Sequence, residues 1–249
     1  MNQVRQASIL ELIEKKKVVA INEIQSLFPD VSFMTIHRDL AKLEQEGHIV
    51  KIRGGARLIS HKTEAVYEER THEQVEGKRI IAEKALPLIQ KDSCIFLDSG
   101  TTILAIARSL LDIPLTIFTT SPGIAIELRD LSKIAINICG GKLNPSTLSL
   151  SGYNTLKTLE DVNIDLAFIG VSGCSADSGF TCGQESEMMV KQKVIEKTKT
   201  AVVVFDHTKL NRLLPFTFAT IADIDMIITD QPLPEDFARQ IKDAKVALL

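Results

Sequence analysis

Hydrophobic positions near the start of the chain recur at the three- and four-residue spacing of amphipathic helices. The spacing predicts a helix over 4–16, and Asn22 can cap a second, shorter helix over 22–28. Ser32 offers an N-cap oxygen for a third helix of about 14 residues. The apolar face of this third helix consists of Ile36, Leu40 and Leu43. The pattern therefore predicts three consecutive helices.

After the third helix the pattern changes from helical spacing to alternation. Apolar and basic residues alternate over 48–52, and an extended pattern resumes over 56–59 after Gly54 and Gly55. Alternation on both sides of paired glycines predicts a β-hairpin. Three helices followed by a hairpin are typical of a winged helix-turn-helix module, in which one helix enters the major groove and the hairpin lies against phosphates.

The rest of the chain alternates between short apolar runs and helical stretches. Residues 60–75 are polar and lack an apolar stripe, so we interpret them as a linker between a DNA-binding domain over 1–59 and a second domain over 76–249. The predicted strands are 94–97, 115–119, 135–139, 166–170, 201–205, 226–228 and 246–248. Strands that alternate with helices indicate an α/β domain with a largely parallel sheet, whose ligands bind at the carboxyl ends of the strands.

Composition excludes several classes of protein. The 249 residues are 45% hydrophobic, and no apolar run approaches the roughly 20 residues that span a bilayer, so we expect a cytoplasmic protein without a membrane partner. The four cysteines are far apart and have no zinc-ligand spacing, which argues against a disulfide framework and a structural metal site. We expect no cofactor.

The net charge of −3 argues against a nucleic-acid partner when it is taken over the whole chain, but the charge is unevenly distributed along the sequence. Residues 1–60 hold nine Lys and Arg against seven Asp and Glu, whereas the remainder hold 20 against 25. A mildly basic N-terminal module therefore precedes an acidic domain, and a DNA contact by that module is permitted.

The third helix and the hairpin hold the candidate DNA contacts. An arginine at the start of this helix can contact a guanine edge or a phosphate, and hydroxyl groups suit phosphate. The candidates are Ser32, Phe33, Thr35, His37 and Arg38 in the helix and Lys51, Arg53, Gly54 and Gly55 in the wing. The alternative is a structural three-helix bundle with solvated charges, or a module that binds protein.

At this point the chain resembles a known family. Val-Ser-Phe-Met-Thr-Ile-His-Arg-Asp-Leu at 31–40 and Arg-Gly-Gly-Ala at 53–56 are similar to the N-terminal module of the DeoR family of bacterial sugar-catabolism repressors. In that family the helix typically has the sequence Ser-x-x-Thr-Ile-Arg-Arg-Asp-Leu. This chain departs from it at Phe33 and His37, and a histidine is charged only when protonated. The resemblance implies that the partner is double-stranded operator DNA.

Polar residues at five successive strand ends form a candidate effector site in the second domain. The segment 98–102 joins a strand to a helix, and its backbone N–H groups suit a phosphate. The candidates at these ends are Asp98, Ser99, Gly100, Thr101, Thr102, Thr119, Ser121, Gly140, Gly141, Lys142, Ser172, Gly173 and Lys209. Loops always carry polar residues, so ordinary solvated loops are the alternative.

This set also resembles the DeoR-family effector domain, which is similar in fold to ribose-5-phosphate isomerase. The resemblance implies that 98–102 and Lys209 contact a sugar phosphate. The isomerase's Asp-Gly-Ala-Asp turn is replaced here by Gly-Val-Ser-Gly at 170–173. Lys191 lies near the expected position of its glutamate base, with Glu185 and Glu187 as nearby carboxylates. Because proton transfer needs a positioned base, we expect a sensor with no catalytic residues.

The hypothesis from sequence is a transcriptional regulator, a repressor of a carbohydrate-catabolism operon controlled by a phosphorylated sugar. We expect a homo-oligomer, a dimer or tetramer, because paired operator half-sites match protein symmetry. The alternative from another class is a sugar-phosphate isomerase or transferase with an accessory N-terminal module.

Overall fold

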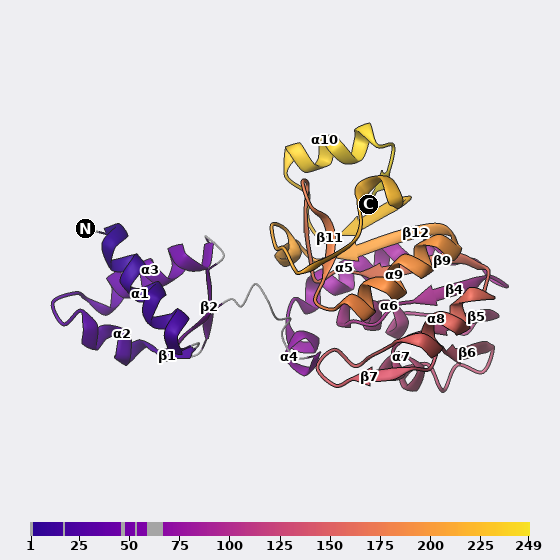
Figure 1. Cartoon of the computed structure of the whole chain (residues 1–249), viewed down its shortest axis with the longest axis horizontal. Coiled ribbons are helices and arrows are strands. Elements are labelled where there is room, and N and C mark those ends of the chain that lie inside the picture. The colour runs from indigo at the N-terminus through magenta and orange to yellow at the C-terminus, as the bar shows by residue number, and fades with distance from the viewer. Residues whose placement is uncertain (1, 17, 46–47, 53, 59–66) are drawn as a thin grey trace. The chain divides into compact units, whose positions relative to one another are not determined.

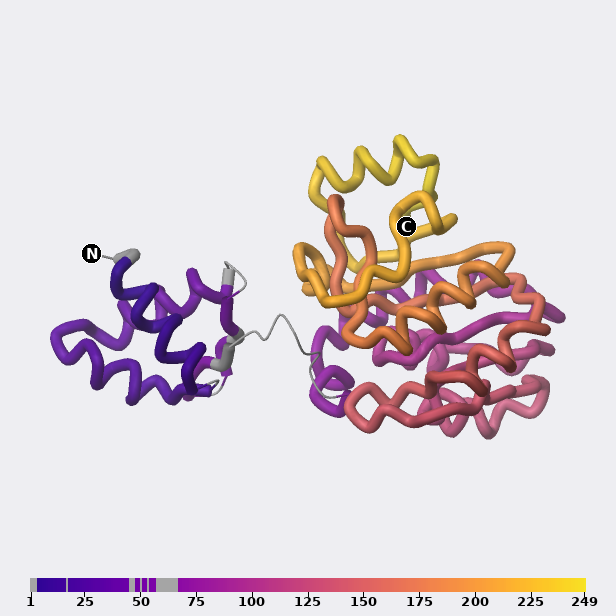
Figure 2. The backbone as a smooth tube through the Cα atoms, viewed as in Figure 1, coloured from indigo at the N-terminus to yellow at the C-terminus, as the bar shows by residue number. Residues whose placement is uncertain are grey.

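The computed structural model describes residues 2–16, 18–45, 48–52, 54–58 and 67–249. The chain divides into two compact units, Met1–Ser60 and His61–Leu249. Figure 1 shows their helices and strands as a ribbon, and Figure 2 traces the same backbone as a tube. Each unit is built around its own hydrophobic residues, so each is described by itself.

The N-terminal unit packs three helices against a small sheet. The helices are α1 (Asn2–Lys16), α2 (Ile21–Leu27) and α3 (Phe33–Gln45). The sheet has the order β1-β3-β2, and its antiparallel strands are β1 (Val18–Ala20), β2 (Ile49–Ile52) and β3 (Gly55–Leu58). The predicted three helices and hairpin are confirmed. Strand β1 was not predicted, because it is a three-residue segment that becomes a strand only by pairing with β3.

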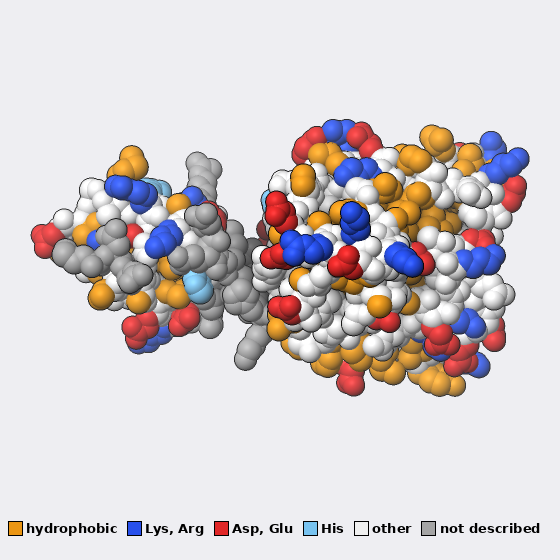
Figure 3. Space-filling model, turned by 90° about the horizontal axis from the view of Figure 1, so that it is seen from above, with side chains coloured by type: hydrophobic (Ala, Val, Ile, Leu, Met, Phe, Trp, Pro, Cys, Tyr) orange, Lys and Arg blue, Asp and Glu red, His pale blue; other side chains and the backbone are white. Residues whose placement is uncertain are grey.

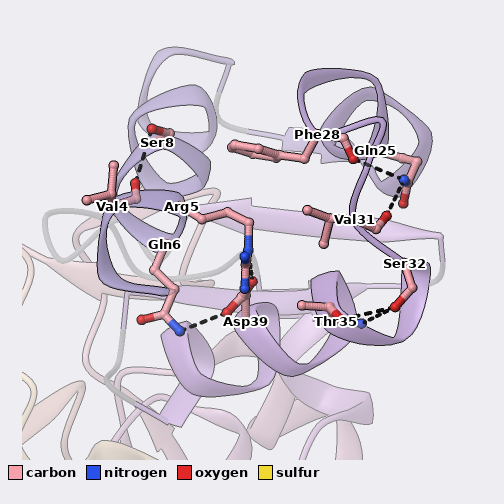
Figure 4. Close-up of polar contacts among 10 residues, drawn as sticks. All are labelled: Val4, Arg5, Gln6, Ser8, Gln25, Phe28, Val31, Ser32, Thr35 and Asp39. Carbon is pink, nitrogen blue, oxygen red and sulfur yellow. Dashed lines mark hydrogen bonds and ion pairs between the residues drawn. The ribbon is translucent and has the colours of Figure 1, made fainter. Parts of the chain in front are cut away.

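The orientation of α3 is fixed from its inner side. Ile36 and Leu40 are fully buried in the core of the unit. The buried carboxylate of Asp39 accepts a hydrogen bond from Arg5 Nε at 2.5 Å and one from Gln6 Nε2 at 2.8 Å, both across from α1. Figure 4 shows both side chains extending from α1 to Asp39. These contacts determine which residues of α3 face outward.

The C-terminal unit is built on a seven-stranded sheet of order β15-β14-β12-β9-β4-β5-β6. Its strands are β4 (Cys94–Leu97), β5 (Leu115–Thr119), β6 (Ile134–Ile138), β9 (Ile164–Gly170), β12 (Thr198–Phe205), β14 (Met226–Thr229) and β15 (Ala247–Leu248). Every neighbouring pair in this sheet is parallel. The predicted α/β domain with a largely parallel sheet is therefore confirmed, and all seven predicted strands lie in it.

Helices cover both faces of this sheet. They are α5 (Val75–Ala85), α6 (Thr101–Arg108), α7 (Pro122–Glu127), α8 (Tyr153–Glu160), α9 (Glu185–Lys197) and α10 (Glu235–Asp243). Side chains alternate between two cores along a strand, because successive residues point to opposite faces. In β12, Val202 belongs to the same buried cluster as Ile81 of α5 and Ile103 of α6, whereas Val203 belongs to the cluster that contains Val194 of α9.

Some short elements were not predicted. Two small antiparallel sheets contain β7 (Lys142–Asn144) with β8 (Ser149–Ser151), and β10 (Gly173–Ser175), β11 (Gly179–Cys182) and β13 (Phe216–Ala219). Their strands have only three or four residues, too few for a clear period. The remaining short elements are the single-turn helices η1 (Leu86–Leu88), η2 (His207–Lys209) and η3 (Ile221–Asp223).

The segment interpreted as a linker, 60–75, differs from that interpretation in its second half. Residues 67–72 form a helix, α4 (Tyr67–His72), and Tyr67 and Arg70 are buried against the C-terminal unit. The Tyr67 N–H donates to the Ser146 carbonyl at 3.0 Å, which fixes the start of α4 on the β7–β8 turn. The helix is stabilised by that surface rather than by an apolar stripe of its own. Residues 60–66 lie outside the described part of the chain.

Candidate functional site

A recess that is open to solvent lies at the carboxyl ends of β4 and β9. The sequence-predicted residues that line it are Ser99, Gly100, Thr101, Thr102, Ser172, Lys191 and Lys209. The others are Arg70, Ile103, Thr147, Gly170, Val171 and Glu187. The charged lining residues described are Arg70, Lys191, Lys209 and Glu187, and Lys191 is paired with the buried Asp98 carboxylate. Arg70 and Lys209 therefore leave the lining with more positive than negative charge, which favours an anionic ligand.

The turn between β4 and α6 supplies backbone donors to the recess. Gly100 precedes α6 with a φ of +124°, a value in the region that favours glycine. Its carbonyl accepts the first helical hydrogen bond, from Leu104 N–H at 2.9 Å. The N–H groups of the first turn have no partner within an α-helix, and the helix dipole adds partial positive charge there. This terminus therefore suits a phosphate or carboxylate group.

A buried ion pair connects β4 with α9 beneath the recess. Lys191 Nζ donates to Asp98 Oδ2 and, at 3.0 Å, to the Gly170 carbonyl. The Gly170 N–H in turn donates to the same Asp98 oxygen at 3.0 Å. The side chains of Lys191 and Asp98 are each 3% exposed, so bulk water solvates neither charge. Asp98 therefore fixes the neighbouring loops and does not itself line the recess, although it was predicted to contact the ligand.

The pair keeps Lys191 charged. Burial lowers the pKa of Lys191, but the Asp98 and Glu187 carboxylates outweigh burial and raise it above its ordinary value. Glu187 Oε1 lies 3.5 Å from Lys191 Nζ. The ammonium group also lies 5.3 Å from the centre of the Phe218 ring, a favourable cation–π distance. Lys191 is thus a permanent cation at the floor of the site.

Arg70 enters the recess from α4 and was missed by the sequence analysis. Its side chain is 92% buried by the fold, and its guanidinium carbon lies 5.8 Å from the Tyr67 ring centre. The only local signal was Tyr67 and Arg70 at a spacing of three in a polar segment. Such a signal does not distinguish a helix that lines a ligand site from a solvated linker.

The C-terminal end of α4 is bound by a second buried cation. Lys78 Nζ donates to the carbonyl of Arg70 and, at 2.6 Å, to that of Glu73. Burial lowers the pKa of Lys78 to about 8, and the nearby Asp206 carboxylate offsets part of that effect. Lys209 and Arg70 lower the pKa further by charge repulsion. The three cations therefore share one local field.

Lys209 reaches the recess from a short turn that Asp206 caps. Asp206 is the N-cap of η2, and its Oδ1 accepts a hydrogen bond from the Thr208 N–H at 3.0 Å. His207 is engaged locally, since its Nδ1 lies 2.8 Å from Asp230 Oδ2. Lys209 therefore lines the recess, whereas His207 is hydrogen-bonded to Asp230.

Several predicted contacts have local structural roles instead. The Thr119 hydroxyl accepts a hydrogen bond from Ser121 N–H at 3.0 Å, and Ser121 caps α7 through Ile124 N–H at 3.3 Å. A side chain at Gly141 would meet Thr155 Oγ1 at 2.2 Å, and one at Gly173 would meet the Arg212 carbonyl at 2.5 Å. Close packing explains both glycines.

Three more predicted effector residues lie away from the recess lining. They are Gly140, Lys142 and Glu185. Glu185, which we predicted to contact the ligand, is exposed in the first turn of α9. Glu187 lines the recess in its place. The correction follows from helix geometry, because residues two apart on a helix face different directions.

The outward side of α3 holds most of the predicted DNA contacts. His37 and Arg38 are exposed, as is Phe33 in the first turn. The Ser32 and Thr35 hydroxyls lie 3.0 Å apart at the start of the helix, where Thr35 N–H also donates to Ser32 Oγ at 3.3 Å (Figure 4). These two residues therefore cap α3 while remaining near its surface.

The wing residues divide into exposed and buried positions. Lys51 is exposed and lies 3.3 Å from Glu44 of α3, so part of its charge is neutralised within the unit. Gly54 is exposed at the turn, but Gly55 is buried, and a side chain there would meet the Val19 carbonyl at 2.2 Å. The close packing of Gly55 on β1 explains why a glycine stands there, and its contact with DNA stays a prediction. Arg53 lies outside the described residues.

Charge is mixed on the surface of both units. On the face drawn in Figure 3, lysine and arginine side chains alternate with acidic and hydrophobic ones. Among the described residues, the lysine and arginine side chains visible on this face of the N-terminal unit do not form a continuous basic area. The site for DNA has to be assigned from individual residues of α3 and the wing.

Within the described residues, no group of three or more His, Cys, Asp or Glu side chains could hold a metal ion. No helix in the same part of the chain is long and apolar enough to cross a membrane. The cysteines are free thiols. Burial raises the pKa of Cys139, Cys174 and Cys182 to about 12. A thiolate is therefore scarce at neutral pH, and these side chains act as core residues.

Comparison with known proteins matches both units. Residues 5–62 match the DeoR-like helix-turn-helix domain, and residues 73–231 match the DeoR C terminal sensor domain. The HTH-type transcriptional repressor GlcR of Bacillus subtilis is 34% identical over 228 residues, which cover 91% of this chain and 88% of the relative. The glycerol-3-phosphate regulon repressor of Escherichia coli is 30% identical over 245 residues, which cover 98% and 97%.

Among solved structures, the chain is similar to ribose 5-phosphate isomerase A from Methanocaldococcus jannaschii. The two share 18% sequence identity and align over 54% of each chain with a TM-score of 0.40.

Proposed function

The chain belongs to the DeoR family of transcriptional regulators, and from that premise we propose that it represses a carbohydrate-catabolism operon in the cytoplasm under control of a phosphorylated sugar. The N-terminal unit binds operator DNA through α3 and the wing. The C-terminal unit binds the sugar phosphate in the recess at the carboxyl ends of β4 and β9. Ligand binding changes operator affinity, which requires that the ligand bind the DNA-competent and DNA-incompetent states unequally.

The charge of the recess is the observation that carries this proposal. Its lining combines the N-terminus of α6 with Arg70 and Lys209, whereas the charge of Lys191 is balanced by Asp98 beneath the recess. Glu187 is the one carboxylate among the described lining residues. A phosphate dianion is the small-molecule group that best matches convergent N–H groups and cations. The names of the two relatives support a sugar-related ligand, since one is a repressor called GlcR and the other controls a glycerol-3-phosphate regulon.

The lining residues suggest a division of roles. The first turn of α6 and Lys209 bind the phosphate, with Arg70 closing it from α4. Hydroxyl groups of Ser172 and Thr147 and the Glu187 carboxylate face the same recess and suit the hydroxyls of a sugar. The Asp98–Lys191 pair below them maintains the positions of the loops.

The chemistry favours binding over turnover. Isomerisation of a sugar phosphate needs a carboxylate free to remove a proton from carbon. Among the described lining residues Glu187 is the one carboxylate, and its Oε1 lies 3.5 Å from the Lys191 ammonium. Turnover of pentose and hexose phosphates by the purified protein, abolished in Glu187→Gln, would contradict a pure sensor.

A thermal-shift screen tests the ligand class. We expect phosphorylated sugars to raise the unfolding temperature while the same sugars without phosphate do not, because a ligand of the native state stabilises it in proportion to occupancy. Lys209→Met should abolish the shift, and the surface change Lys157→Met, outside the recess lining, should preserve it. Equal shifts with unphosphorylated sugars would overturn the assignment of the phosphate site.

An operator assay tests the regulatory half of the proposal. Duplexes selected from a random library by the full-length protein should be released, or bound more tightly, when the stabilising ligand is added. Subunit count by light scattering on the same complex should give a dimer or tetramer. A ligand that stabilises the protein without altering duplex affinity would leave the recess a binding site with no regulatory role.

A further inference from the structure

The first turn of α3 exposes an apolar side chain that the fold leaves uncovered. Met34 is 72% exposed and its neighbour Phe33 is 49% exposed, whereas Ile36 and Leu40 on the inner side are buried. A single exposed methionine is ordinary on a protein surface. This one begins the outward face of the helix that the proposed function assigns to the major groove.

Helix geometry places Met34 beside the charged candidates for base contact. Residues three and four positions apart lie on one face of a helix, so Met34 shares a face with His37 and Arg38. All three are exposed. The opposite side is fixed by Asp39, which is hydrogen-bonded to Arg5 and Gln6 of α1, so α3 cannot turn Met34 inward without breaking those bonds.

We propose that Met34 contacts the C5-methyl group of a thymine in the operator and so specifies an A·T pair beside the base contacted by Arg38. This assignment rests on the proposed function. The thymine methyl is the apolar feature of base edges in the major groove, and the other edges present hydrogen-bond donors and acceptors that a thioether side chain cannot match. A phosphate contact is excluded by the same reasoning, since methionine has no donor.

Burial of the methyl group against Met34 provides the affinity. Removing one buried methyl-sized group from water contributes enough free energy to change binding about fourfold. Methionine suits the task because its unbranched side chain adapts to the shape of the groove. The preference should be confined to one base-pair position in each half-site.

Uracil substitution isolates this contact, because deoxyuridine pairs with adenine as thymidine does and lacks only the C5-methyl group. The full-length protein first selects its duplex from a random library, and each thymidine of that duplex is then replaced singly. We expect one replacement per half-site to weaken binding by the wild-type protein about fourfold. The same replacement should have no effect on Met34→Ala, which already binds the unmodified duplex more weakly.

Two matched variants serve as controls. Met189→Ala removes an exposed methionine from α9 in the other unit and should keep the full uracil effect. Phe33→Ala should also keep it, and loss of the effect in Phe33→Ala with retention in Met34→Ala would overturn the assignment to Met34. Because Met34 is exposed, all variants should unfold at the wild-type temperature.

The remaining outcomes separate the inference from the proposed function. Sequence-specific binding that is indifferent to every uracil replacement overturns the methyl contact and leaves the regulator intact. Failure to select any duplex contradicts the proposed function itself. Normal duplex binding by Met34→Ala together with loss of a protein partner would assign the exposed side chain to a protein interface and overturn the inference.

Discussion

A single buried carboxylate, Asp39, sets the orientation of α3 on α1. It is 3% exposed and accepts hydrogen bonds from Arg5 and Gln6. In Asp39→Ala the Arg5 guanidinium, whose side chain is 12% exposed, loses its carboxylate. Removing one partner of a buried pair costs about 3 kcal/mol. We expect urea denaturation followed by circular dichroism to show this loss in the N-terminal unit, with unfolding of the C-terminal unit unchanged.

Arg38→Ala is the control for Asp39→Ala, because Arg38 lies on the exposed side of the same helix. Its effect on stability should stay within about 0.5 kcal/mol while it weakens DNA binding. Equal destabilisation by the two substitutions would contradict a structural role specific to Asp39.

Lys78 should make ligand binding in the proposed effector site depend on pH. Burial lowers its pKa to about 8, so Lys78 is charged below that pH and neutral above it. Its positive charge adds to the field of Lys209 and Arg70. Binding of a phosphorylated sugar should therefore weaken as pH rises through about 8, well above the pH at which phosphate itself titrates, about 6. Calorimetric titrations between pH 7 and 9.5 measure this step.

Lys78→Met removes the titrating group. Affinity in the variant should be lower at pH 7 and flat across the same range. An unchanged slope in the variant would show that another group is responsible.

At the scale of elements, α4 is the first described helix after the N-terminal unit and also lines the ligand recess through Arg70. Arg70→Met should reduce ligand affinity at least tenfold, since hydrogen bonds to charged groups contribute about 1.5–3 kcal/mol. Operator affinity without ligand should remain unchanged. Gel-shift titration with and without ligand separates the two effects, and loss of ligand-free operator binding would contradict the assignment of Arg70 to the effector.

At the scale of the whole molecule, the two units have separate cores. Among the described residues, the buried core of the N-terminal unit runs from Ile9 to Ala56, and the two clusters of the other unit begin at Tyr67 and at Phe96. We expect two thermal transitions, one for each unit. A sugar phosphate at a concentration 100 times its Kd should increase the free energy of unfolding of the C-terminal unit by about 3 kcal/mol and leave that of the N-terminal unit unchanged. Scanning calorimetry measures both transitions, and an equal rise in both would show that the units unfold together.

Most of this architecture could be predicted because it follows from local periodicity. The three helices carry a helical period, and the seven strands of the large sheet are short apolar runs that alternate with helices. Helix α4 could not be predicted, because it is stabilised by hydrogen bonds to Ser146, which is distant in sequence, and to Lys78 of the following helix rather than by an apolar stripe of its own. The short strands of the small sheets depend in the same way on their partners.

The lining residues of the recess could be predicted where they belong to one strand–helix turn. They could not be predicted where they come from segments that are distant in sequence. Ser99 to Thr102 belong to a single strand–helix turn and line the recess as predicted. Arg70 arrives from a segment that looked like a linker. Conversely, Thr119 and Ser121 have the residue types of ligand contacts but form a local cap of α7. Sequence type alone does not distinguish a hydroxyl that caps a helix from one that binds a ligand.

The buried Asp98–Lys191 pair also constrains how this sequence can evolve. The two positions are 93 residues apart, yet changing either one alone leaves an uncompensated charge in the interior. A lineage that loses one of them is expected to lose the other as well, by passing through a weakened intermediate or by exchanging both for neutral groups. Among descendants of a common ancestor, Asp98 and Lys191 should therefore be inherited as a unit, even where the surface residues around the recess diverge with the ligand.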